Sequence, residues 1–299
     1  KDQGVDLKVI SGDDPVTVSA IAKKAGLENA DKYIDATTIT TPEDMERAVA
    51  ECSVFGRVTP QQKKEMVLAL QKQKHTVAMT GDGVNDVLAL KEADCSVVMA
   101  EGSDAAKNIA NVVLMDSNFA AMPEIVNQGR RVVNNIRTAA SMFLIKTIFS
   151  ALLCLITIFW GDSYPFEPIQ MSLISACAVG IPTFLLAQEN NFNKIESGFL
   201  RYVFMNAFPA AVTITGCVFT IMLVCQNVYH SNVMLSTACF LVTGWNYMAA
   251  LKTVYAPLSR YRKIIIYGMQ FIFFFAAVCV QNLLALGSLE FGMITLVFI

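Results

Sequence analysis

Charged residues are scarce in the second half of this 299-residue sequence. Residues 1–137 hold 16 Lys or Arg and 20 Asp or Glu, whereas the remaining residues hold only 7 and 5. Hydrophobic residues make up 54% of the chain and charged residues only 16%, an unusual balance for a soluble protein. The imbalance excludes a chain that is soluble throughout, and it predicts one soluble domain followed by a membrane domain.

Histidine and clustered cysteine are also lacking. The sequence has 2 histidines, and its 8 cysteines form neither a C-x-x-C pair nor a cluster with histidine. A zinc centre, an iron–sulfur centre or a disulfide framework is therefore not expected. The formal net charge of −2 gives no reason to expect a nucleic-acid partner. The chain opens without a secretory signal and stops inside an apolar stretch at Ile299, so we expect it to be a piece of a longer protein.

The most informative segment is a seven-residue loop that follows the short apolar run 77–79. It reads Thr80-Gly81-Asp82-Gly83-Val84-Asn85-Asp86. Its glycines allow backbone angles that other residues resist, so one turn can present Asp82 and Asp86 together. Carboxylate oxygens suit Mg²⁺, which usually keeps water and a phosphate oxygen among its ligands. The loop therefore predicts a phosphoryl-transfer site, the alternative being a Gly/Asp turn that caps the next helix.

Short apolar runs alternate with helical segments across the first 111 residues. Asp14, Thr41 and Thr59 each precede a proline, which is the pattern of a helix N-cap followed by the first helical residue. The alternation predicts the α/β class, with a parallel sheet covered on both faces. The predicted strands are 7–10, 53–58, 75–79 and 96–99, and the predicted helices are 15–25, one that opens at 42, 60–73, 84–92 and 103–111.

Three of the predicted strands end in residues suited to binding phosphate. These residues are Ser11-Gly12-Asp13 after the first strand, Arg57 at the end of the second, and Thr80-Gly81-Asp82 after the third. Ligands of parallel sheets collect beyond the carboxyl ends of the strands. We therefore expect the three groups to converge on one edge of the sheet.

The second half of the chain contains apolar stretches long enough to cross a bilayer. Each approaches the roughly 20 residues that a hydrocarbon core requires. The five predicted spans are 138–160, 169–187, 202–226, 233–254 and 264–283, and a sixth begins near Phe291 and is truncated. We expect an all-α membrane bundle of about six helices.

The loops between the predicted spans differ in charge. One set, at 188–201 and 255–263, is basic, and the opposite set has no Lys or Arg, so the positive-inside rule predicts a cytoplasmic soluble domain in a multi-pass protein of the cell membrane. The basic set holds Lys194, Arg201, Arg260, Arg262 and Lys263, and the opposite set holds Asp162, Glu167, His230 and Glu290. The mixed-polarity segment 123–137 is expected to be a helical stalk continuous with the first span. The predicted domains are therefore 1–122, 123–137 and 138–299.

At this point the sequence resembles the carboxy-terminal half of a P-type (E1-E2) cation-transporting ATPase, a family of pumps that pass through an aspartyl-phosphate. The resemblance rests on three motifs that occur in the family's order: Ile10-Ser11-Gly12-Asp13, Arg57-Val58-Thr59-Pro60-Gln61-Gln62-Lys63, and Thr80 to Asp86. It implies a partial haloacid-dehalogenase-like, Rossmannoid phosphorylation domain at 1–122. It also implies Mg²⁺ and ATP as cofactors.

The resemblance also implies roles for individual residues. Asp82 would be a Mg²⁺ ligand, and Lys63 would neutralise charge on the transferred phosphoryl group, as a compact ammonium can. Asn85 and Asp86 would order the loop and the phosphate, and Arg57 would lie near the nucleotide. Ser11, Gly12 and Asp13 would hold phosphoryl oxygens through a hydroxyl and backbone N–H groups. The implied catalytic residues are Lys63, Asp82 and Asp86.

The sequence departs from the family at its nucleophile. That residue belongs to a D-K-T-G-T string, which does not occur here, and the nucleotide-binding domain, the actuator domain and the first four helices are missing as well. The chain alone is therefore expected to be inactive. Its expected partners are the missing amino-terminal half, membrane lipid and the transported cation.

The polar groups of the predicted spans bear on the identity of the transported ion. The first two predicted spans contain no Asp or Glu, so their polar groups are Lys146, hydroxyls, Gln170 and the carbonyls near Pro182. Lys146 is either a built-in counter-ion or a side chain that snorkels to the cytoplasmic face. The runs 164–170 and 180–187 are similar to a bacterial subgroup linked with calcium, which favours Ca²⁺. The alternatives are a phospholipid flippase of the same superfamily, a membrane-anchored phosphatase of the same fold and a non-enzymatic fragment.

Overall fold

The computed structural model describes residues 3–161, 163–195, 198–228 and 232–287. The chain divides into two compact units, Lys1–Val126 and Asn127–Ile299, called here the α/β unit and the helical unit. The truncated sixth span near Phe291 and the loop residues Asp162, His230 and Glu290 lie outside the described residues. The predicted domain boundaries stay a prediction.

The α/β unit contains parallel strands, as predicted, but they form two sheets rather than one. The first sheet has the order β1 (Val9–Ile10), β3 (Val54–Gly56), β2 (Tyr33–Asp35), and the second has the order β4 (Ala78–Thr80), β5 (Cys95–Met99), β6 (Val112–Leu114). The sheets are separate because β1 pairs with β3 alone and β4 with β5 alone. β2 and β6 were not among the predicted strands.

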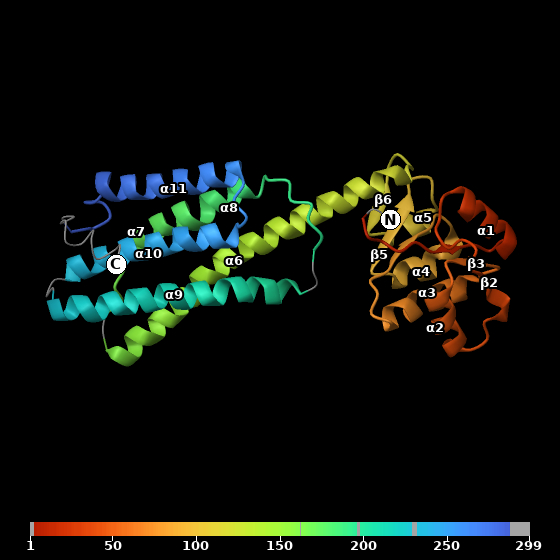
Figure 1. Cartoon of the computed structure of the whole chain (residues 1–299), viewed down its shortest axis with the longest axis horizontal. Coiled ribbons are helices and arrows are strands. Elements are labelled where there is room, and N and C mark those ends of the chain that lie inside the picture. The colour runs from red at the N-terminus through yellow and green to blue at the C-terminus, as the bar shows by residue number, and fades with distance from the viewer. Residues whose placement is uncertain (1–2, 162, 196–197, 229–231, 288–299) are drawn as a thin grey trace. The chain divides into compact units, whose positions relative to one another are not determined.

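The helices of the α/β unit begin where the capping signals predict. Asp14, Thr41 and Thr59 cap α1 (Pro15–Lys24), α2 (Pro42–Glu51) and α3 (Pro60–Lys72), each through its side-chain oxygen. Helices α3 and α4 (Val87–Glu92) pack against each other (Figure 1). α3 has Met66 in the core beneath the first sheet and Val67 in the core beneath the second, so this helix joins the two halves of the unit.

Two predicted helices are shorter than expected. Residues Val84–Asp86 form a 3₁₀ turn before α4, and α5 (Asp104–Lys107) ends well before residue 111. The reason for the second difference is Asn111, whose side-chain oxygen accepts from the Ser96 N–H at 2.8 Å while its own N–H donates to the Ser96 hydroxyl at 3.0 Å. These bonds hold the chain extended beside β5, where β6 begins.

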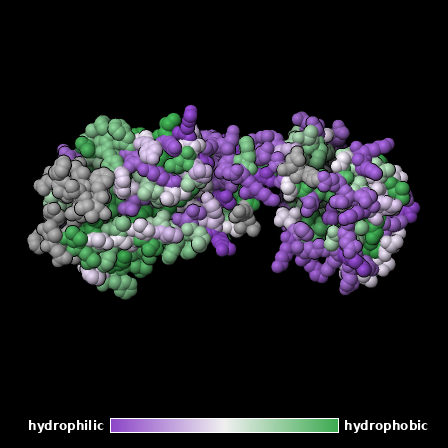
Figure 2. Space-filling model, in the orientation of Figure 1, coloured by the Kyte–Doolittle hydropathy of each residue, from purple (hydrophilic) through white to green (hydrophobic). Residues whose placement is uncertain are grey.

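The helical unit consists mainly of long apolar helices. Within the described residues, five stretches have the length and composition to cross a membrane, as predicted. They are α6 (Met122–Trp160), α7 (Pro168–Ile174) with α8 (Ile181–Leu186), α9 (Phe199–Val228), α10 (Asn232–Val254) and α11 (Arg260–Cys279). α6 is unbroken and so includes both the predicted stalk and the first predicted span. Figure 2 shows that hydrophobic residues cover most of this unit's visible face, whereas hydrophilic residues cover the α/β unit.

The second span is irregular at its centre. A π-helical segment, Ser175–Gly180, separates α7 from α8, and Pro182 lies in the first turn of α8. π-Helical turns widen the backbone locally and are frequent at functional sites. Aromatic rings fill the core around this span, and Phe149, Tyr247 and Phe273 are fully buried.

Candidate functional site

The structure brings Lys63 and Asp86 into contact at the end of β4. The ammonium Nζ of Lys63, on the first turn of α3, lies 2.7 Å from Oδ1 of Asp86. Both side chains are largely buried, with exposed fractions of 14% and 11%. The second carboxylate oxygen of Asp86 accepts from the Gly83 N–H at 3.3 Å, so Asp86 also closes the glycine-rich loop. A charged pair with this little exposure costs desolvation free energy, so stability alone explains it poorly.

Asp82 lies in the same loop but faces solvent. Its backbone carbonyl accepts from the Ser103 N–H at 2.8 Å, which ties the loop to the start of α5. Its carboxylate is exposed and has no hydrogen-bond or ion-pair partner among the described residues. An unengaged carboxylate on an anchored loop is available to a ligand.

The oxygen ligands at this loop suit Mg²⁺, which takes only a few ligands from the protein, better than they suit a metal whose ligands all come from protein side chains. Within the described part of the chain no three His, Cys, Asp or Glu side chains gather into a metal-binding group. Asp86 is occupied by Lys63, which leaves Asp82 as the exposed carboxylate of the loop. Mg²⁺ is commonly bound through one or two carboxylates, with water and phosphate oxygens completing its shell. The residues present therefore fit such a site.

The predicted phosphate-binding residues Ser11, Gly12 and Asp13 form a turn after β1. The Ser11 hydroxyl donates to Asp13 Oδ2 at 3.0 Å and accepts from the Asp13 N–H at 3.2 Å. The Asp13 carbonyl accepts from the Arg57 N–H at 2.8 Å, which joins this turn to the end of β3. The described contacts connect Ser11–Asp13 with Arg57, whereas Lys63, Asp82 and Asp86 form a second group beyond β4.

Arg57, which directly follows β3, links the start of α1 to the end of β2. Its guanidinium lies 3.0 Å from Oδ1 of Asp14 and 2.9 Å from Oδ2 of Asp35, and its backbone has the positive φ of 52°. A left-handed conformation is uncommon for a residue with a side chain, and such outliers cluster at functional sites. Thr37 donates to Asp35 through its hydroxyl and N–H and thereby holds the pKa of that carboxyl below its usual range, to which Arg57 adds. Asp35 was missed from the sequence because it is the last residue of β2, a strand that was not predicted.

The polar side chains of the second span are largely used for structure. Gln170 is fully buried, donates to the Leu284 carbonyl at 3.1 Å and accepts from the Ser236 hydroxyl at 2.9 Å. Thr183 donates to the carbonyls of Val179 and Gly180, so the Gly180 carbonyl, one of those expected to be free near Pro182, already has a partner.

Two buried hydroxyl groups on α10 differ in their hydrogen bonding from many threonine hydroxyls of the helical unit. Thr243 and Tyr247 lie one turn apart, are fully buried, and have no hydrogen-bond partner for their oxygens among the described residues. Many threonines of the helical unit instead donate to a carbonyl one turn earlier on their own helix, as Thr215 and Thr237 do. The sequence offered no signal for this pair, because a Thr and a Tyr in an apolar helix are ordinary. The structure identifies them as polar groups of the core that are open to a further partner.

Comparison with known proteins now adds to these observations. Residues 1–94 match a family model described as haloacid dehalogenase-like hydrolase. The chain is 43% identical over 274 residues to a probable cation-transporting ATPase, exp7, of Streptococcus pneumoniae, which covers 89% of this chain and 35% of that protein. It is 42% identical to the calcium-transporting ATPase CtpE of Mycolicibacterium smegmatis, covering 74% of this chain and 29% of that protein, and 34% identical to a calcium-transporting ATPase of Bacillus subtilis, covering 63% and 22%.

Fold and relatives agree on the class. The protein is a multi-pass membrane protein with a cytoplasmic haloacid dehalogenase-like domain built on parallel strands. Within that class, the chain is the carboxy-terminal part of a P-type cation-transporting ATPase. It spans about a third of the length of the curated relatives that it matches.

Proposed function

We propose that the protein containing this chain is an ATP-driven pump that moves a cation across the membrane through an aspartyl-phosphate intermediate. The observation that supports this most directly is the Lys63–Asp86 pair beside the exposed carboxylate of Asp82. One loop thus offers a positive charge for a phosphoryl group and an anionic ligand for a metal. Phosphoryl transfer needs such positioning and charge stabilisation more than it needs covalent help from the protein.

Each residue of the site has a part in this proposal. Asp86 holds the Lys63 ammonium in place at 2.7 Å, so the charge is positioned before substrate arrives. Asp82 would hold Mg²⁺, which supplies positive charge to the phosphate oxygens when bound. Ser11 would turn its hydroxyl from Asp13 to a phosphoryl oxygen. Arg57 already pairs with two carboxylates. It would therefore hold the end of β3 near ATP rather than bind phosphate directly.

The nucleophile would come from the amino-terminal half of the pump. Among the described residues, β1 and β4 are each paired on one side, and their other edges keep backbone groups for a further strand. A strand that carries the D-K-T-G-T string and pairs with these edges would lie beside the two polar loops, Ser11–Asp13 after β1 and Thr80–Asp86 at the end of β4. This requirement makes the amino-terminal half an obligatory partner in the proposal.

The transported ion is proposed to be divalent, with Ca²⁺ preferred. Two of the relatives above are named calcium-transporting ATPases. Other relatives are named for potassium and sodium, which is why the ion needs its own test. The α6, α7 and α8 segments bring no carboxylate into the membrane, so acidic ligands would come from the missing helices. Thr243 and Tyr247 on α10 would add neutral oxygens, which hard cations accept.

The catalytic proposal is tested with Asp82→Asn in the complete pump. We expect loss of the acid-stable phosphoenzyme that forms from Mg-ATP, with unchanged amounts of protein in the membrane. The matched control is Asp31→Asn, which removes an exposed carboxylate from a loop of the same unit and should leave phosphorylation unchanged. Normal phosphorylation of Asp82→Asn would remove Asp82 from its role.

The choice of ion is tested by measuring ATPase activity against a panel of cations. Stimulation by Ca²⁺ at lower concentration than by Mn²⁺, Na⁺ or K⁺ is the expected result. Stimulation by a phospholipid and by none of the cations would instead assign the protein to the flippases.

A further inference from the structure

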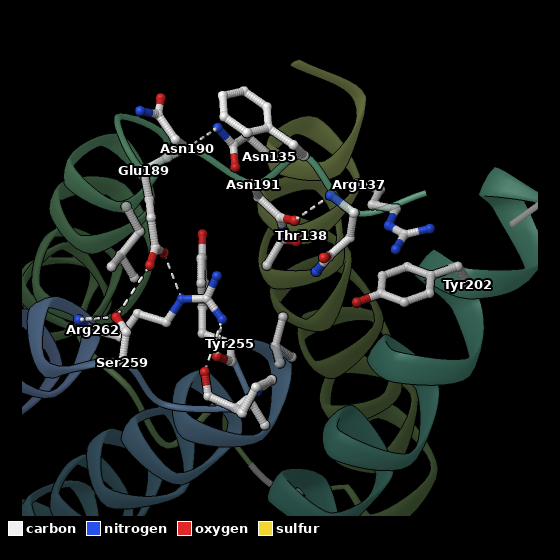
Figure 3. Close-up of a pocket in the computed structure, with 16 residues that line it drawn as sticks. Asn135, Arg137, Thr138, Glu189, Asn190, Asn191, Tyr202, Tyr255, Ser259 and Arg262 are labelled. Carbon is white, nitrogen blue, oxygen red and sulfur yellow. Dashed lines mark hydrogen bonds and ion pairs between the residues drawn. The ribbon is translucent and has the colours of Figure 1, made fainter. Parts of the chain in front are cut away.

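The helical unit contains a polar cavity of about 350 Å³ where several spans end (Figure 3). α6 contributes Arg137, just before the first predicted span, and α9 contributes Tyr202 in its first turn. The segment after α8 contributes Glu189, and Ser259 and Arg262 come from the start of α11. Since these residues all lie at the ends of spans that carry the basic loops, the cavity lies at the level of the cytoplasmic lipid head groups.

The wall formed by residues 187–193 is hydrogen-bonded to α6. Asn135 donates to the carbonyls of Ala187 and Glu189, at 2.8 and 3.2 Å. Asn134 donates to the carbonyls of Asn191 and Asn193, at 3.1 and 3.0 Å. The segment is therefore fastened to α6 along its length, and the cavity is preformed.

The charges that face the cavity leave a surplus of one positive charge. Glu189 accepts from Arg262 Nε at 2.5 Å through one oxygen and from the Ser259 hydroxyl at 3.1 Å through the other. Arg262 also donates to the carbonyls of Tyr255 and Pro257. This pair is internally satisfied, so no unengaged carboxylate of the lining is left for a cation.

Arg137 lies on the side of the cavity away from Glu189 and Arg262. Its guanidinium carbon sits 4.1 Å from the centre of the Tyr202 ring, and Figure 3 shows the guanidinium next to that ring. The contact with the ring holds the guanidinium in place but engages none of its N–H groups in a conventional hydrogen bond. Those groups have no acceptor among the described residues, although the side chain is half-buried. A held guanidinium with open donors is suited to bind a phosphate through paired hydrogen bonds.

The geometry points to a binding site for the head-group phosphate of an anionic phospholipid. Arg137 binds the phosphate oxygens, Tyr202 holds Arg137, and the amides of Asn190, Asn191 and Asn193 surround the head group. The cavity has the volume of roughly twelve water molecules at about 30 Å³ each, enough for a glycerophosphate group. Basic pockets between spans on the cytoplasmic side are where anionic lipids of that leaflet bind. A free phosphate would use the same donors, so the experiment has to separate the two sources.

The test is native mass spectrometry of the purified pump in neutral detergent. Dioctanoyl phosphatidylglycerol is the probe, dioctanoyl phosphatidylcholine is the zwitterionic comparison, and inorganic phosphate is the free-anion arm. We expect one phosphatidylglycerol bound in preference to phosphatidylcholine. Arg137→Gln should weaken this binding about tenfold or more, the effect of losing a charge-assisted hydrogen bond. Arg137→Lys keeps the charge but not the paired donors, so its affinity for phosphatidylglycerol should lie between that of the parent and that of Arg137→Gln.

The matched control is Arg201→Gln, next to Tyr202 on α9. It removes an exposed arginine at the same membrane level from outside the cavity lining and should bind phosphatidylglycerol within twofold of the parent. Equal weakening by Arg137→Gln and Arg201→Gln would reduce the effect to surface charge and overturn the proposal. Binding of inorganic phosphate in place of the lipid, with the same dependence on Arg137, would assign the cavity to a free anion and overturn it as well. Size-exclusion profiles identify any variant that fails to fold, and Arg137→Lys then carries the comparison.

Discussion

Gly81→Ala is expected to disable the site without touching any charged residue. A Cβ built on Gly81 would lie 2.7 Å from Cβ, Cγ and Oδ2 of Asp86. Carbon atoms in contact are normally about 3.5–4.0 Å apart, so the overlap approaches 1 Å. The neighbouring atoms belong to a side chain fixed on both sides, by Lys63 through one oxygen and by the Gly83 N–H through the other. Asp86 therefore cannot move aside without losing at least one of these bonds.

The cost follows from these contacts. Overpacking in a filled site costs about 1–3 kcal/mol. Displacing Asp86 from Lys63 adds to this, because it leaves an ammonium with 14% exposure unpaired. We therefore expect a destabilisation of about 3 kcal/mol for the α/β unit. The displaced Lys63 would also stabilise the transferred phosphoryl group less, and a loss of about 1.4 kcal/mol there lowers the rate of phosphoenzyme formation about tenfold.

Two measurements distinguish damage to the site from loss of stability of the α/β unit. Phosphoenzyme formation from Mg-ATP measures the site, and the temperature of half-cleavage in thermal proteolysis measures the stability of the α/β unit. Gly83→Ala is the matched control, because its Cβ would lie 3.6 Å from Asp86 Oδ2, an ordinary contact. If Gly81→Ala behaves like Gly83→Ala in both readouts, the packing argument for Asp86 is wrong.

Two further predictions concern the acid side of stability and the helical core. Because the pKa of Asp35 is lowered in the folded state, its ionised carboxylate stabilises that state at pH values above about 4, the usual pKa of Asp. This contribution is lost as the pH falls through the lowered pKa. Thr37→Val should therefore shrink the loss of thermal stability between pH 7 and pH 3, whereas Thr38→Val, which removes a hydrogen bond to the Asp35 carbonyl alone, should not. Gly244→Ala should destabilise the helical unit by about 1–3 kcal/mol, because its Cβ would lie 2.1 Å from the buried ring of Phe273. Thermal inactivation in detergent measures this, Gly216→Ala should be neutral, and failure of Phe273→Leu to restore the Gly244→Ala variant would contradict the assignment of the clash.

Helix starts and membrane spans could be predicted from the sequence because their causes are local. Asp14 and Thr59 bind N–H groups two or three residues away, so the cap and the proline that follows it are visible in a single run of residues. A span needs only a long apolar stretch, and five such stretches are helical in the structure. Lys63 and Asp82 could be named as candidate site residues because their motifs are also short runs of consecutive residues.

Contacts between distant residues could not be read in this way. β2 and β6 are three residues long, and they exist as strands because β3 and β5 are present to pair with them. The end of α5 depends on Asn111 meeting Ser96, and the conformation of Arg57 depends on Asp14 and Asp35. A linear pattern holds no information on such partners.

The sequence by itself determined the class of the protein, since hydrophobic length, charge distribution and the order of three motifs are properties of the chain alone. Only the tertiary structure decided that Lys63 is held by Asp86, that Asp82 stays open to solvent, and that Arg137 is held on Tyr202 beside a polar cavity. The physical reason is that a charge acquires its role from what surrounds it within a few ångströms. Those neighbours come from parts of the chain that only folding brings together.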